Sequence, residues 1–243
     1  MAKHSILFSP VKGRRTFEEV SHEIKKLIFQ GSLKPGDKLP PELELANQFN
    51  VGRQTIREAL RILELSGFIK VHKGFGGGPV IKDTILNQIG SLYLDAFQME
   101  KITIDELTVA RYKIEKMIIQ DAVAFADEDD WVALSENVEA ARKKIEAKTI
   151  ALEENIEFHK LLAKATKNHV FFVLVSSILA LLQELLSRLP PDLKVSEAAV
   201  VSHEKLLTEL MSKKGRKKAE RILAEHLESV KNRLQSLPDK IYE

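Results

Sequence analysis

The chain contains no cysteine, which excludes disulfide bonds and thiolate metal sites and fits a reducing cytoplasm. Long apolar runs are also missing, because the most apolar stretch, residues 170–182, has only 13 residues and includes two serines. Such a stretch is too short to span a bilayer and is typical of a buried helix. Residues 1–13 lack the apolar core of a signal peptide. We therefore expect a cytoplasmic protein that contacts no membrane.

A large net charge is absent as well, since the whole chain carries only +2. The charge is unevenly divided: residues 1–81 hold 13 Lys and Arg against 8 Asp and Glu, and residues 82–243 hold 24 against 27. A basic first part on a mildly acidic body is typical of a protein whose N-terminal part binds a polyanion. With 243 residues and 44% apolar residues, the chain is expected to fold as one large or two ordinary globular domains.

The first part of the chain predicts three helices followed by a hairpin. Apolar spacing indicates helices over residues 17–30, 41–49 and 53–66, with Pro41 as the first residue of the second helix. Residues 68–81 alternate apolar and polar positions around a glycine-rich turn, which predicts two short strands. Helix, short turn, helix and hairpin in this order predict a winged helix-turn-helix. The domain boundary is expected near residues 80–84, which gives domains 1–81 and 82–243.

The rest of the chain predicts only helices. The fold class is therefore mainly α: a winged helix-turn-helix followed by an all-helical bundle of six or seven helices. The expected helices cover residues 84–99, 104–126, 128–147, 150–166, 170–189, 196–211 and 216–237. Thr103 and Glu106 have the spacing of a capping box at one of these starts.

The helix that begins at Arg53 has the composition of a DNA-recognition helix. The first residues of such a helix meet base edges in the major groove, where Arg pairs with guanine and Gln with adenine. Three arginines lie four residues apart, on the face opposite the apolar one; a merely solvent-exposed basic face is the alternative reading. The predicted DNA-binding residues are Arg53, Gln54, Thr55, Arg57, Arg61, and, at the hairpin tip, His72, Lys73 and Gly74.

Three segments of this part resemble the GntR family of bacterial repressors. They are LPPELELA at residues 39–46, FNVGRQTIREAL at 49–60 and LSGFI at 65–69. The resemblance implies that Arg53, Thr55 and Arg57 read bases and phosphates, with Lys73 and Gly74 at the wing tip. Leu43 stands where the family often has a DNA-contacting arginine, so the operator is expected to differ from the common one.

The all-helical second part resembles the FadR subfamily, whose FCD domain binds ligands. Residues 111–115, residues 155–159 with Asn168, and His203 with His226 carry the resemblance. Since these segments span the whole domain in the right order, the resemblance implies an effector-binding, dimerising domain.

Four polar residues of this domain form a candidate metal site. Asn155 and His159 lie four residues apart on one helix and so share a face, and His203 and His226 lie on two later helices. Three imidazoles and one side-chain oxygen suit Zn²⁺ or Ni²⁺. The family resemblance implies the same set with Asp at position 155. Because an amide is a weaker ligand than a carboxylate, weaker metal binding, a lost metal and a metal-free polar pocket all stay open.

Two roles are open for Arg111: its planar guanidinium can bind an effector carboxylate, or it can pair with Glu115 one turn later.

The expected function is that of a homodimeric repressor of a two-fold operator, released by a small carboxylate or fatty acid-like effector, and the protein is not expected to be an enzyme. One alternative is a metal-dependent hydrolase with a DNA-targeting head, although Glu154 and Glu157 flank the histidines only in sequence. The other is an architectural DNA-binding protein without a ligand.

Overall fold

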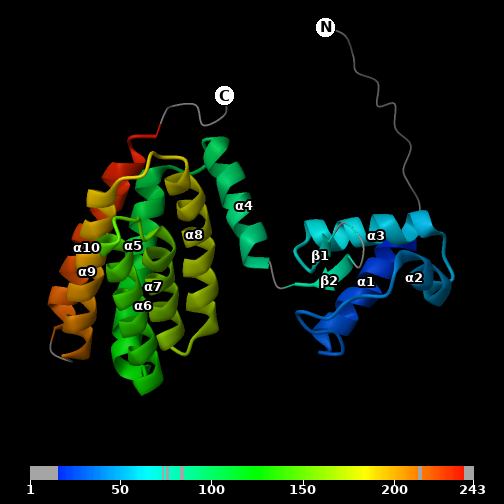
Figure 1. Cartoon of the computed structure of the whole chain (residues 1–243), viewed down its shortest axis with the longest axis horizontal. Helices are drawn as coiled ribbons and strands as arrows, with labels where there is room; N and C mark the ends of the chain where they lie inside the picture. The colour runs from blue at the N-terminus through cyan, green and yellow to red at the C-terminus, as the bar shows by residue number, and fades with distance from the viewer. Residues whose placement is uncertain (1–15, 73, 75–76, 83–84, 213–214, 238–243) are drawn as a thin grey trace, which may run out of the picture. The chain divides into compact units, whose positions relative to one another are not determined.

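The computed structural model describes residues 16–72, 74, 77–82, 85–212 and 215–237. The chain divides into two compact units, Met1–Gln88 and Ile89–Glu243. Within the described residues there are ten helices and one two-stranded sheet (Figure 1), which confirms the predicted mainly α fold class.

The first unit has the predicted order of three helices and a hairpin. Strands β1 and β2 are antiparallel, with Ile69 opposite Ile81 and His72 opposite Gly78. One detail of the prediction was wrong: Pro41 precedes α2 as its N-cap, with an extended backbone, and is not its first helical residue. The elements are α1 (Thr16–Phe29), α2 (Glu42–Phe49), α3 (Arg53–Leu65), β1 (Ile69–His72) and β2 (Gly78–Ile81).

The turn between α2 and α3 fixes how α3 is presented. Asn50 ends α2 in the left-handed conformation at φ 52°, where its backbone N–H bonds to carbonyls of the last turn of α2. Gly52 then caps the start of α3 with an extended backbone. An apolar core holds the unit together and includes Ile24, Leu45, Ile56, Leu63, Ile69 and Ile81.

Seven helices follow β2 in the part of the chain that the structure describes, which is the higher of the two predicted numbers. Helix α9 begins three residues earlier than expected, because the Asp192 side chain accepts the Val195 N–H and caps the helix there. The predicted capping box of Thr103 and Glu106 is present. The helices are α4 (Ile85–Gln98), α5 (Ile104–Phe125), α6 (Glu128–Glu146), α7 (Leu152–Ala165), α8 (His169–Ser187), α9 (Leu193–Met211) and α10 (Arg216–Leu234).

Helix α7 is the central element of the bundle and packs against α5, α6, α8 and α9, while α10 packs against α5 and α9 (Figure 1). Phe158 of α7 is fully buried in the shared apolar core. Polar side chains on α5, α7, α9 and α10 are in contact with one another inside the bundle, and this arrangement positions the site described below.

Helix α8 is long and apolar enough to span a membrane by length and composition alone. Eight of its residues, from Val175 to Leu185, are nevertheless buried within the bundle. A core helix of a helical domain has the same composition, so α8 fits a core helix of this bundle.

Candidate functional site

Helix α3 displays the predicted DNA-reading residues on its exposed face. Arg53, Gln54, Arg57 and Arg61 are exposed and Thr55 is partly exposed. The opposite face of the helix is buried in the core of the unit through Ile56, Ala59, Leu60 and Leu63. The apolar face thus anchors α3 and leaves its first turn free for a groove.

Two of these residues bond to acidic neighbours. The Arg57 Nε lies 2.8 Å from a carboxylate oxygen of Glu42 on α2, and Gln54 donates to Glu58 one turn later at 3.2 Å. Both contacts are exposed to solvent, where such pairs contribute little stability and are readily exchanged. Glu42 was not identified from the sequence, since it lies fifteen residues before Arg57.

The wing, which is the hairpin of β1 and β2, needs glycine at its tip. A side chain at Gly77 would lie 2.3 Å from the His72 carbonyl oxygen, and Gly74 has a φ of 103° that favours glycine. His72 is exposed at the end of β1, and Leu43 is exposed on α2. Lys73 lies outside the described residues.

In the helical unit, three imidazoles from three helices converge. The Nε2 atom of His159 on α7 lies 3.2 Å from Nε2 of His203 on α9 and 3.2 Å from Nε2 of His226 on α10. A tetrahedral zinc with Zn–N bonds of about 2.0–2.1 Å places its ligand nitrogens roughly 3.3 Å apart. The two distances from His159 therefore match a metal centre, and the ligand nitrogens of all three rings lie within 4.8 Å of one another.

Burial keeps the three rings neutral. It lowers the pKa of His159, although Glu115 opposes the effect. Burial, neighbouring imidazoles and Arg111 hold the pKa of His203 and of His226 well below the usual 6.5. Neutral imidazoles offer the lone pairs that a metal needs, so the cluster is in the right protonation state for one at neutral pH.

Glu115 on α5 orients His159. Its carboxylate lies 2.6 Å from His159 Nδ1 and 2.5 Å from Arg111 Nε, and all three side chains are buried. Burial raises the pKa of Glu115, but Arg111 and His159 outweigh it and lower the value to about 2. The ionised carboxylate favours a proton on Nδ1, which directs the Nε2 lone pair toward the other two rings. The sequence predicted the pairing of Arg111 with Glu115 as one option but not the contact with His159.

Asn155, the predicted fourth ligand, lies one turn before His159 on α7 and lines the cavity next to the cluster. Its Oδ1 atom is buried and has no hydrogen-bond partner among the described residues. A buried acceptor without a partner is costly, and a metal ion is one group that satisfies it. Three imidazoles and this amide oxygen therefore fit the divalent metal that the family resemblance implies.

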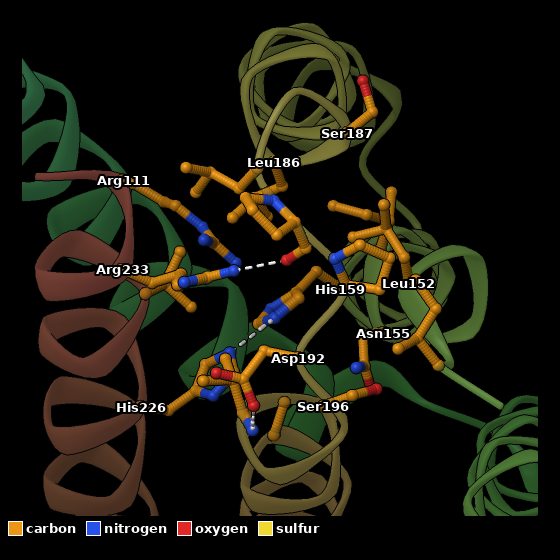
Figure 2. A pocket seen from close by; sticks show the side chains of 18 residues that line it. Arg111, Leu152, Asn155, His159, Leu186, Ser187, Asp192, Ser196, His226 and Arg233 are labelled. Atoms are coloured by element: carbon orange, nitrogen blue, oxygen red, sulfur yellow. Dashed lines mark hydrogen bonds between the residues drawn. The ribbon is translucent and has the colours of Figure 1, made fainter. Parts of the chain in front are cut away.

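A cavity of about 310 Å³ opens onto this cluster (Figure 2). Asn155, His159, His226 and Arg111 line it, together with apolar residues of α7, α9 and α10. His203 does not; its ring stacks on Phe158 with the centroids 4.2 Å apart. An ion at the cluster would thus be held from behind by His203 and would face the cavity.

Each of the two units matches the sequence model of a known protein family. The sequence model for bacterial regulatory proteins of the gntR family matches residues 16–77, and the FCD domain model matches residues 106–229. The chain belongs to the GntR family, in the subfamily with an FCD domain. As a GntR-family protein it is a DNA-binding transcription regulator. All the predicted DNA-binding and metal-ligating residues lie within the two matched ranges.

Relatives of known name agree with this assignment. The chain is 27% identical over 233 residues to the HTH-type transcriptional repressor NanR of Salmonella arizonae, covering 93% of this chain and 87% of the relative. It is 26% identical over 230 residues to the repressor of the same name from an Enterobacter species, covering 91% and 86%. A solved structure of a Streptococcus agalactiae GntR protein shares the fold, with a TM-score of 0.61 and 23% identity over 89% of this chain and 99% of that one.

Proposed function

We propose that this GntR-family regulator is a repressor that a small carboxylate effector releases from its operator. The convergence of three buried imidazoles beside a cavity, in the same chain as an exposed recognition helix, carries this proposal. Burial of polar groups costs free energy unless hydrogen bonds, ion pairs or a bound ligand compensate it, and the Asn155 oxygen has no such partner among the described residues. The similar proteins named as transcriptional repressors support the direction of control.

We infer that His159, His203, His226 and Asn155 hold a divalent metal, with Zn²⁺ or Ni²⁺ the best match to this donor set. When bound, such an ion supplies positive charge and open coordination positions that an effector carboxylate can fill. Arg111 lines the same cavity, and among the described residues its hydrogen bond to Glu115 comes from Nε, so its other N–H groups can anchor the effector.

A hydrolase is disfavoured by the chemistry of the cluster. Glu115 is the carboxylate in contact with the imidazoles, and a pKa of about 2 makes it a poor general base. Its oxygens already face Arg111 and His159. We therefore assign the cluster to binding and not to catalysis.

Regulation requires two states with different effector affinity. The working form we propose is a cytoplasmic homodimer, because two linked α3 helices on a two-fold operator make about twice the phosphate contacts of one. The effector would favour an arrangement of the two DNA-binding units that does not fit the half-site spacing.

The proposal is tested by selecting duplexes from a random pool with the full chain and measuring affinity by fluorescence anisotropy. A repressor of this kind binds a selected, two-fold-symmetric sequence at least 1,000-fold more tightly than unselected DNA. The zinc-loaded protein should then lose that affinity when one member of a carboxylate panel is added. Weak sequence preference and no response to any carboxylate would instead indicate an architectural protein.

A further inference from the structure

A second arginine reaches the effector cavity from α10. Arg233 lies seven residues after His226, which is about 10 Å along the helix axis, and Val230 lies between them. All three line the cavity, so one face of α10 runs from the imidazole cluster to Arg233 (Figure 2). The FCD match ends at residue 229, so Arg233 lies outside it.

Arg233 differs from the other arginines of its unit. Five of the six described arginines of this unit pair with a glutamate: Arg111, Arg142, Arg188, Arg216 and Arg221. Arg233 instead donates from Nη2 to the backbone carbonyl of Pro190 at 2.5 Å, and no ion pair joins it to an acidic side chain in the described part of the chain. A neutral carbonyl leaves the guanidinium without a negatively charged partner among the described residues.

The acidic residue near Arg233 has another role. Asp192 also lines the cavity, but its Oδ1 accepts the Val195 N–H at the start of α9. A helix N-terminus stabilises a carboxylate in this position. Asp192 thus caps α9 and forms no ion pair with Arg233 among the described residues, so the remaining donors of Arg233 stay available to a ligand.

Apart from the imidazoles and the arginines, the cavity is lined mainly by apolar side chains. Ile156, Leu186, Leu189, Val195 and Val230 form its wall. A volume of about 310 Å³ is at the small end for a ligand site and suits a molecule with a short hydrocarbon body. At the imidazole cluster, a divalent metal held by four neutral side chains keeps more positive charge than one carboxylate neutralises.

We propose that Arg233 binds a second carboxylate of the effector, so that the site selects dicarboxylates whose acid groups are separated by a hydrocarbon chain. The first carboxylate binds at the metal and Arg111, and this part rests on the function proposed above. The second replaces the Pro190 carbonyl as the acceptor of Arg233, since a bond between two charged groups is roughly twice as strong as one to a neutral acceptor.

Isothermal titration of the zinc-loaded full chain tests this assignment. The probes are suberate and octanoate, which have equal chain length, bracketed by the shorter pair adipate and hexanoate and the longer pair sebacate and decanoate. In the parent protein the preferred diacid should bind about 10- to 100-fold more tightly than its matched monoacid, the usual effect of a hydrogen bond to a charged group. Arg233→Gln should abolish this preference and leave monoacid affinity within about twofold.

Arg221→Gln is the matched control, because it removes an exposed arginine from the same helix and should keep the preference. Equal losses for diacid and monoacid in Arg233→Gln, or a preference that persists, would overturn the role of Arg233. Monoacid binding by the parent without any diacid preference would overturn it too and leave the proposed function intact. If the zinc-loaded parent binds none of the six acids, the proposed carboxylate site itself fails, and this inference fails with it.

Discussion

The two functional regions of this regulator use similar residue types in opposite settings. On α3 the polar side chains are exposed, and their protein partners are weak surface contacts such as Arg57 with Glu42. In the helical unit the charges of Arg111 and Glu115 and the three imidazoles are almost completely buried. Exposed charges act on an external partner and tolerate change, whereas buried ones depend on each other and fail together.

The largest effect should come from breaking the buried network. Glu115→Gln leaves Arg111 as an unpaired buried charge, which should destabilise the protein by roughly 3–5 kcal/mol. The loss of the carboxylate behind His159 should also weaken metal affinity about 10- to 100-fold. Urea unfolding and competition with a zinc chelator measure the two effects.

Glu139→Gln is the control for this comparison, because Glu139 forms an exposed pair with Lys143 one turn along α6. It should change stability by no more than about 1 kcal/mol. Similar effects of the two substitutions would mean that the buried network contributes no more than a surface pair.

A single exposed arginine should matter only to DNA. Arg53→Ala should weaken binding to the selected operator by about 1–3 kcal/mol and leave the unfolding free energy nearly unchanged. Anisotropy titrations of parent and variant measure the change, with Arg221→Ala as a control in the helical unit. Unchanged operator affinity would remove Arg53 from the base-reading set.

The buried imidazoles should also make the metal-free protein sensitive to acid. Their pKa values are lowered in the folded state, so the unfolded chain binds more protons as the pH falls through about 6.5. Each imidazole then removes up to about 1.4 kcal/mol of stability per pH unit. Urea unfolding with a chelator at pH 7.5, 6.5 and 5.5 should show falling stability, whereas a flat profile would contradict neutral buried rings.

The smallest effect concerns the exposed pair on the DNA-binding unit. Glu42→Gln frees Arg57 and removes a negative charge near the DNA-facing side of α3. Non-specific DNA affinity should rise by no more than about 1 kcal/mol, and the gain should shrink in high salt. A loss of operator affinity would show instead that Glu42 holds Arg57 in its binding position.

The contrast between the regions also explains what the sequence predicted. Apolar periodicity and turn residues gave the helices, the hairpin and the exposed face of α3, because these features depend on neighbours along the chain. The convergence of His159, His203 and His226 was expected mainly from family resemblance. Helical spacing gives the face on which a residue lies, but not which faces of distant helices meet.

The contact of Glu115 with His159 and the proposed role of Arg233 could not be predicted from the sequence. Glu115 was considered only as a partner of Arg111, since its contact with His159 joins residues 44 positions apart. Arg233 carries no motif, and its proposed role follows from the Pro190 carbonyl and the cavity wall. The early start of α9 was also not predicted, because Pro190 and Pro191 indicated a break in the chain, and Asp192 directly after them was not recognised as a helix cap.

Elemental mass spectrometry of protein purified without chelators or metal-affinity resin shows whether the helical unit holds a metal at the imidazole cluster. We expect about one zinc or nickel per chain in the parent and very little in His203→Ala, which removes one of the three imidazoles. No metal in the parent even after incubation with Zn²⁺ or Ni²⁺, or equal metal in parent and variant, would contradict this expectation.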